Sequence, residues 1–296
     1  MKTGTEALAS RLLSAPLPDS LIIPRGDWWP QPRADVVKHP ELKLLGTRRG
    51  AAIERRIEAI VADARTRDVP NVTIVFIAEV LRAARYSDYI TKRLADLADS
   101  VDVVFFARHQ TAALPSIVAH RVQSWMSPEH VDLSLDALVR EANRRFHYDV
   151  MFEKWSREGH NLVALPYFED DYATDGLMKR FSTRLRIPIP DATTKHKKNA
   201  SLGKDQLRRL AQLKRTMAGI RRIVGVRRLA AMVFYAVRKK IRQESPSSRW
   251  TLTSPERREI IELYRESNAR FKGYLGSAAR QSDWKRWFSE LDPPRR

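Results

Sequence analysis

Short apolar runs alternate with helical periodicity along the first two thirds of the chain. Runs rich in Val, Ile, Leu and Phe predict buried strands at 19–23, 71–77, 101–106 and 161–166. Apolar residues spaced three and four positions apart predict helices between and after these runs, at 6–13, 48–67, 112–125, 133–145, 148–158 and 175–185. Strands separated by helices pair in parallel through crossovers. We therefore expect a three-layer α/β/α parallel sheet that binds ligands at the carboxyl ends of its strands.

The last third of the chain has no strand pattern. From residue 195 onward, the periodicity predicts helices at 204–217, 220–242 and 255–275. The last of these has clear start signals, with Thr253 and Ser254 as caps and Pro255 in the first turn. We expect an α/β core at 1–190 and a mostly helical, basic extension at 191–296 packed on this core.

The composition is that of a globular protein, and it fits a reducing compartment. Of 296 residues, 43% are hydrophobic and 7 are Trp, which suits a chain with a sizeable core. There is no Cys, so structural disulfides and Cys-based zinc sites are excluded. The longest apolar run, 229–237, is far shorter than the roughly 20 residues that a membrane span needs. We expect a soluble, cytoplasmic protein.

Most of the net charge of +19 comes from one segment. Residues 191–250 hold 17 Lys and Arg against 3 Asp and Glu, and basic pairs recur there between apolar positions. This pattern predicts helices with an apolar face and a cationic rim, which attract an anionic partner. An acidic glycan or glycolipid, an anionic membrane surface and an ordinary solvated face all fit these residues. Nucleic acid fits the charge, but no DNA- or RNA-binding motif is recognisable.

The first five residues combine the parts of an anion site. Lys2, Thr3, Gly4 and Thr5 lead directly into an amphipathic stretch. Free N–H groups and the dipole at a helix start favour phosphate, Lys adds a positive charge, and Gly lets the backbone approach a ligand. The same residues also fit an ordinary helix start, because Thr3 and Glu6 have the spacing of a capping box.

A second pair of candidates follows the strand predicted at 101–106. Arg108 leaves this strand, and Ser116 lies eight residues later on the next helix. Arg offers a fork of donors and Ser a single hydroxyl, so the two can converge on one anion. The alternative is an unrelated surface Arg and a helix Ser.

The combination of these two elements resembles the nucleotide-binding elements of the sulfotransferases, enzymes that use 3'-phosphoadenosine-5'-phosphosulfate (PAPS). Further stretches resemble the bacterial branch of that superfamily, in the same order along the chain: 147–155, 161–168, 198–201 and 264–270. The resemblance covers most of the chain and implies a P-loop NTPase-like sulfotransferase fold. It also implies a strand directly before Lys2, which we expect to lie upstream of Met1, and a hydroxyl residue in place of Glu6.

The resemblance implies roles for each element. The 5'-phosphosulfate would be held by Lys2, Thr3, Gly4 and Thr5. The 3'-phosphate would be held by Arg108 and Ser116. Charge builds on the bridging oxygen of the leaving phosphate during sulfuryl transfer, and a Lys with helix N–H groups can stabilise it there. No metal is expected, because Lys takes the place that Mg²⁺ has in kinases.

The acceptor also needs a base. Glu79 follows the strand predicted at 71–77, where the family often has Ser-Ser-Glu, and it can take the acceptor proton. A capping or ion-paired Glu79 is an equal alternative. His39, in the loop 24–47, is a rival base, and His109 is a weaker one.

These residues lead to two hypotheses. The first is a sulfotransferase that moves a sulfuryl group from PAPS to a hydroxyl of a carbohydrate or related acceptor. Trp28 and Trp29 would stack on sugar rings in this hypothesis, and burial in the core is an equal alternative for them. The second is a non-catalytic basic protein that binds nucleic acid or an anionic membrane through 195–242.

Overall fold

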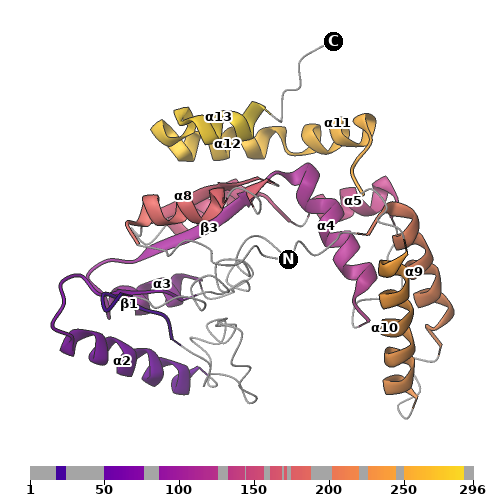
Figure 1. Cartoon of the computed structure of the whole chain (residues 1–296). Helices are drawn as coiled ribbons and strands as arrows, with labels where there is room; N and C mark the ends of the chain where they lie inside the picture. The colour runs from indigo at the N-terminus through magenta and orange to yellow at the C-terminus, as the bar shows by residue number, and fades with distance from the viewer. Residues whose placement is uncertain are drawn as a thin grey trace.

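The computed structural model describes the greater part of the chain. The described residues are 18–24, 50–76, 87–125, 133–143, 145–156, 161–168, 170–171, 175–187, 202–219, 226–244 and 250–289. They form a mixed α/β structure that is mostly helical (Figure 1). Lys2, Thr3, Gly4, Thr5, His39 and Glu79 lie outside these residues, as does the helix predicted at 6–13.

The described strands form two separate parallel sheets, not the single sheet that we expected. β1 (Leu21–Ile22) pairs with β2 (Thr73–Ile74), and β3 (Asp102–Arg108) pairs with β4 (Asn161–Tyr167). The β3–β4 register runs unbroken over seven residues, so the strands predicted at 101–106 and 161–166 are confirmed.

The strands predicted at 19–23 and 71–77 are shorter than expected. The N–H groups of Thr73 and Val75 donate hydrogen bonds to the carbonyls of Ser20 and Ile22 and extend this short pairing at both ends. Pro24 follows on the first strand and has no N–H to donate, which ends the pairing on that side. Asn71 has a φ of 57°, a left-handed turn that delays the start of the second strand.

Helical crossovers connect both pairs of parallel strands. α2 (Ala51–Thr66) joins β1 to β2 and buries Ile53, Ile57 and Val61 together with Trp155. α3 (Ser87–Ala95) precedes β3. The crossover from β3 to β4 contains α4 (Gln110–Gln123), α5 (Leu135–Ala142) and α6 (Tyr148–Ser156), and α8 (Gly176–Leu185) follows β4.

The described residues of the C-terminal part form helices and short connections, with no strand among them. It contains α9 (Lys204–Thr216), α10 (Arg227–Gln243), α11 (Ser254–Leu263), α12 (Arg265–Leu275), a 3-10 turn (Gly276–Arg280) and α13 (Ser282–Ser289). Figure 1 shows α11, α12 and α13 as one layer beside the β3–β4 sheet, with α9 and α10 together on the flank next to α4.

The helix predicted at 255–275 is two helices. The chain bends at Tyr264, whose hydroxyl lies 2.9 Å from the carbonyl oxygen of Ala142 and 2.6 Å from that of Arg145. This buried contact with the end of α5 holds the break between α11 and α12, and nothing in the local sequence requires it.

The C-terminal helices share one core with the β3–β4 region. The largest apolar cluster contains Leu114 and Leu138 from the crossover helices together with Tyr264, Phe271 and Trp287 from the C-terminal ones. A domain boundary near 190 therefore stays a prediction. Among the described helices, none is both long and apolar enough to cross a bilayer.

Candidate functional site

Arg108 ends strand β3, directly before the start of α4. Its side chain is buried, and its Cζ atom lies 5.5 Å from the ring centroid of Tyr167, the paired residue on β4. The Arg108 N–H donates to the Tyr148 hydroxyl over 2.9 Å, and that hydroxyl donates to the Arg108 carbonyl over 2.7 Å. Tyr148, on α6, therefore fixes the backbone at the carboxyl end of β3.

Ser116 lies on α4, in the second turn, and is half-buried. The structure thus places Arg108 at the end of a parallel strand and Ser116 on the helix that follows, which are the elements that the sequence predicted for them. That end of a parallel sheet is the place where α/β proteins bind ligands, and the dipole of α4 favours an anion there.

His109 is the cap of α4. Its Nδ1 lies 2.6 Å from the Thr111 hydroxyl and accepts the Thr111 N–H over 3.3 Å, and its ring lies 5.3 Å from the Trp287 ring. Burial and, to a smaller extent, the positive charge of Arg257 lower the pKa of His109 to about 3. An imidazole with so low a pKa is a weak base, and this one is buried, so both properties argue against His109 as the acceptor base.

Two stretches far apart in the sequence, 147–155 and 264–270, pack on each other through α6 and α12. Ser267 donates a hydrogen bond to Asp149, and Arg270 Nε donates to the same carboxylate over 2.8 Å. Burial alone would raise the pKa of Asp149, but the hydrogen bonds from Ser267 and Arg270 outweigh it and lower this pKa. Both stretches belong to the sequence resemblance, and the contact between them was not predictable from either one.

A related contact joins α4 to α12. Gln110 Nε2 donates to Asn268 Oδ1 over 2.7 Å, and both side chains are buried. Gln110 directly follows Arg108 and His109 in sequence, so its hydrogen bond to Asn268 holds α12 against the start of α4. Sequence reasoning missed Gln110 and Asn268, because amides 158 positions apart carry no local signal.

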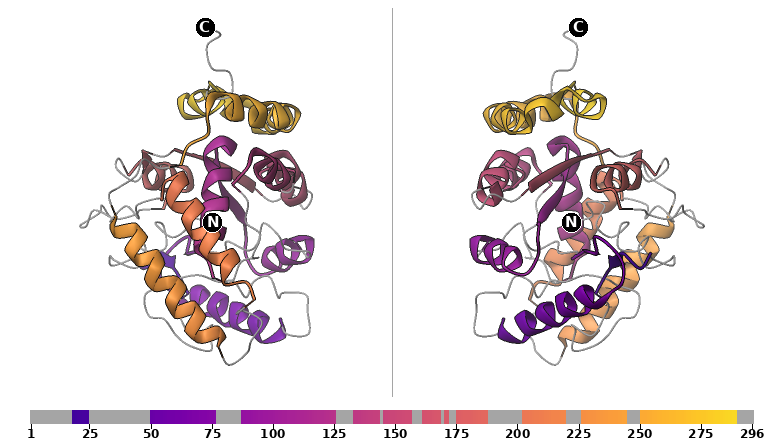
Figure 2. Two further views of the ribbon diagram at one scale, coloured as in Figure 1. Left: turned by 90° about the vertical axis from the view of Figure 1, so that its right-hand side faces the viewer. Right: turned by 90° about the vertical axis from the view of Figure 1, so that its left-hand side faces the viewer.

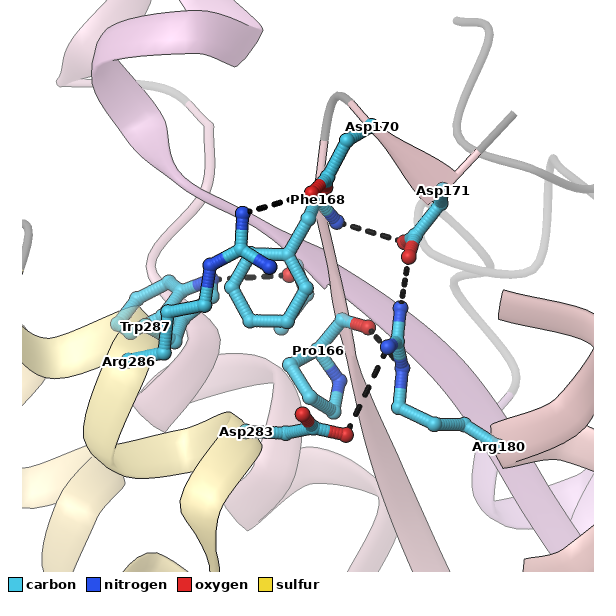
Figure 3. Close-up of polar contacts among 9 residues, drawn as sticks. Pro166, Phe168, Asp170, Asp171, Arg180, Asp283, Arg286 and Trp287 are labelled. Carbon is cyan, nitrogen blue, oxygen red and sulfur yellow. Dashed lines mark hydrogen bonds and ion pairs between the residues drawn. The ribbon is translucent and has the colours of Figure 1, made fainter. Parts of the chain in front are cut away.

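A charged clamp lies at the carboxyl end of β4 (Figure 3). The Phe168 ring packs between two guanidinium groups, with its centroid 5.1 Å from Arg180 Cζ and 4.2 Å from Arg286 Cζ. Arg180 donates to Asp171 and, over 3.1 Å, to the Pro166 carbonyl.

The clamp also ties α13 to the sheet. Arg286 donates to Asp170 over 3.0 Å, and Trp287 Nε1 donates to the Ala107 carbonyl over 3.0 Å (Figure 3). Burial raises the pKa of Asp171, although the Phe168 N–H and Arg180 both hydrogen-bond to it. Each charge here has an opposite partner, so this clamp stabilises the end of the sheet and is not an open anion site.

In the described segments, no cluster of three or more His, Asp or Glu side chains could hold a metal ion. Comparisons with known proteins found no matching family model, no similar curated protein and no similar solved structure. The geometry at the end of β3 is therefore the main guide to function.

Proposed function

We propose that this protein is a sulfotransferase that moves a sulfuryl group from PAPS to a hydroxyl of a carbohydrate or related acceptor. The observation that carries the proposal is the place of Arg108: a guanidinium at the carboxyl end of a parallel strand, next to the start of the following helix. A phosphate held there would gain a charge-assisted hydrogen bond, the dipole of α4 and the hydroxyl of Ser116.

The proposed reaction is an in-line displacement. The acceptor oxygen forms a bond to sulfur while the bond from sulfur to the bridging phosphate oxygen breaks. The products are a sulfate ester and 3'-phosphoadenosine-5'-phosphate. Glu79 takes the acceptor proton, with His39 as the rival base, and Lys2 with Thr3, Gly4 and Thr5 neutralises the charge that develops on the leaving phosphate.

Calorimetric titration with 3'-phosphoadenosine-5'-phosphate tests the site directly. Adenosine 5'-monophosphate is the reference ligand, because it lacks only the 3'-phosphate that Arg108 and Ser116 are proposed to bind. A hydrogen bond to a charged group contributes about 1.5–3 kcal/mol. Arg108→Lys and Ser116→Ala should therefore each weaken the binding of 3'-phosphoadenosine-5'-phosphate by about tenfold or more. Neither change should alter binding of the monophosphate.

Arg140→Gln is the control, because this arginine is exposed and lies on another element, α5. Thermal unfolding by circular dichroism separates loss of binding from loss of fold for the buried Arg108. Equal affinity for the two nucleotides, or no binding of either, would contradict the proposal. The alternative of a non-catalytic basic protein predicts that second result, together with salt-dependent binding of nucleic acid or anionic vesicles.

A further inference from the structure

Helix α10 has two apolar faces, of which only one is covered. Its inner side buries Ala230, Phe234 and Ile241, which recur every three to four residues when the half-buried Val237 is included. The Phe234 ring lies 5.4 Å from the Trp125 ring. This side attaches the helix to the flank of α4 and α9, at the edge of the molecule (Figure 2).

The outer face of α10 consists of Leu229, Met232, Val233 and Ala236. Leu229 is 60% exposed, Met232 is 68% exposed and Val233 is 45% exposed. The four positions have the spacing i, i+3, i+4 and i+7, so they form one continuous stripe along the helix. The described residues include nine large apolar side chains that are exposed, and five of these nine lie between Val226 and Tyr235.

Positive charge surrounds this stripe. The helix carries 6 Lys and Arg and no Asp or Glu. Arg238 and Arg242 are used internally, because they donate to the carbonyl and the side chain of Gln123 over 2.9 and 2.8 Å. Arg228, Lys239 and Lys240 are exposed around and beyond the apolar stripe.

We propose that the outer face of α10 docks on an anionic phospholipid bilayer, with the helix lying in the plane of the interface. At about 1.5 Å per residue, the 17-residue helix is roughly 25 Å long, so it can lie along the surface but cannot span the membrane. The apolar stripe enters the boundary between headgroups and acyl chains, while Arg228, Lys239 and Lys240 contact anionic headgroups.

Charge and chemistry favour the bilayer over other occupants. A nucleic acid backbone offers phosphates for the cations but no apolar layer for Leu229, Met232 and Val233. A second copy of α10 would offer an apolar layer, but it would bring another basic helix without a single acid to neutralise it. Of these three occupants, the anionic bilayer alone supplies both an apolar layer and negative charge. This surface is independent of the proposed sulfotransferase site, and either can fail without the other.

Vesicle co-sedimentation of the full chain tests the proposal. We expect binding to phosphatidylcholine vesicles that contain about 30% phosphatidylserine, and about tenfold weaker binding to pure phosphatidylcholine. Leu229→Glu with Met232→Glu should weaken binding to the anionic vesicles by at least about tenfold, because two inserted apolar side chains are lost. Val150→Glu with Leu263→Glu is the matched control, since it changes the net charge equally at exposed apolar positions outside α10.

A second pair of variants tests the cations. Lys239→Glu with Lys240→Glu should weaken binding to anionic vesicles about tenfold, whereas Lys179→Glu with Lys285→Glu, at exposed positions elsewhere, should change it less than about threefold. Vesicle binding that survives Leu229→Glu with Met232→Glu overturns the proposal. So does the absence of any preference for anionic vesicles. Sedimentation velocity that shows a dimer abolished by that same double change would instead assign the face to a second copy.

Discussion

A buried lysine of α9 binds the backbone carbonyls at the carboxyl end of α4. Lys214 has no exposed surface, and its Nζ donates to the carbonyls of Arg121 over 2.9 Å and Ser124 over 2.7 Å. The last carbonyls of a helix have no partner within it, so a cation placed there satisfies them and complements the helix dipole. Part of the positive charge of residues 191–250 is therefore structural and not available to a partner.

Replacing Lys214 should be costly to stability. Because an unsatisfied buried carbonyl costs about 1–3 kcal/mol, Lys214→Ala should lower the free energy of unfolding by about 3 kcal/mol. Urea unfolding followed by circular dichroism measures this change. Arg215→Ala, at the exposed neighbouring position, should change it by less than about 0.5 kcal/mol. Equal effects of the two changes would show that Lys214 does not hold the end of α4.

His109 should make stability depend on pH. Its pKa is about 3 when folded and 6.5 ordinarily, so between these values the unfolded chain binds a proton that the folded chain does not. The stability contributed by neutral His109 is thus complete above pH 6.5 and falls by about 1.4 kcal/mol per pH unit below it.

The His109→Gln variant should lose this dependence. Its stability deficit relative to the unmodified protein should shrink by roughly 2–3 kcal/mol between about pH 6.5 and about pH 4.5. Urea unfolding across that range checks this, with His120→Gln, an exposed position on the same helix, as the control. An unchanged deficit across the range would contradict a neutral, buried His109.

At the scale of elements, local signals set helix ends. Thr253 caps α11 as predicted: its hydroxyl accepts the Glu256 N–H over 3.4 Å, and the Glu256 carboxylate accepts the Thr253 N–H over 2.8 Å. The end of α12 depends on Gly276, whose φ of 53° and ψ of −126° lie in a region that favours glycine.

Gly273, inside α12, and Gly276, directly after its last residue, should respond in opposite ways to replacement by alanine. A Cβ atom at either position meets no atom within 4 Å, so only the backbone decides. Gly273→Ala, inside the helix, should stabilise the protein by about 0.5–1 kcal/mol. Gly276→Ala should destabilise it by about 1–3 kcal/mol, because alanine at that φ and ψ is strained. Thermal melting of both variants gives the comparison, and changes of the same sign would refute it.

At the scale of the whole molecule, the C-terminal helices and the β3–β4 sheet form one packed unit. Trp287 is fully buried, and its ring packs against Phe271 and Tyr148 with centroids 6.1 and 6.2 Å away. Its hydrogen bond to the Ala107 carbonyl reaches the end of β3. The C-terminal helices thus support the strand end that carries Arg108.

Removing Trp287 should therefore loosen distant elements. Trp287→Ala should cost about 3–5 kcal/mol, and amides of β3 and α4 should lose hydrogen-exchange protection together with those of α12 and α13. Trp284→Phe, a smaller change in the same layer, should keep the protection of β3. Loss confined to α12 and α13 would mean that the C-terminal helices unfold separately.

The sequence by itself determined the elements whose signals are local. Periodicity identified α2, α9 and the strands β3 and β4, and cap residues identified the start of α11, because both depend on neighbours a few positions away. It also placed Arg108 at a strand end and Ser116 on the next helix. The contact between α6 and α12 through Asp149, Ser267 and Arg270 had no such signal.

Tertiary structure decided how those elements combine and which charges are used. Contacts across long sequence distances decided whether β1–β2 joins β3–β4 in one sheet and where the helix after Thr253 breaks. They also decided whether a cation is buried like Lys214 or exposed like Lys239. These outcomes follow from burial and from satisfying polar groups in the packed core, and a local pattern contains neither. The same packing left the outer face of α10 exposed, although its pattern alone is equally consistent with core.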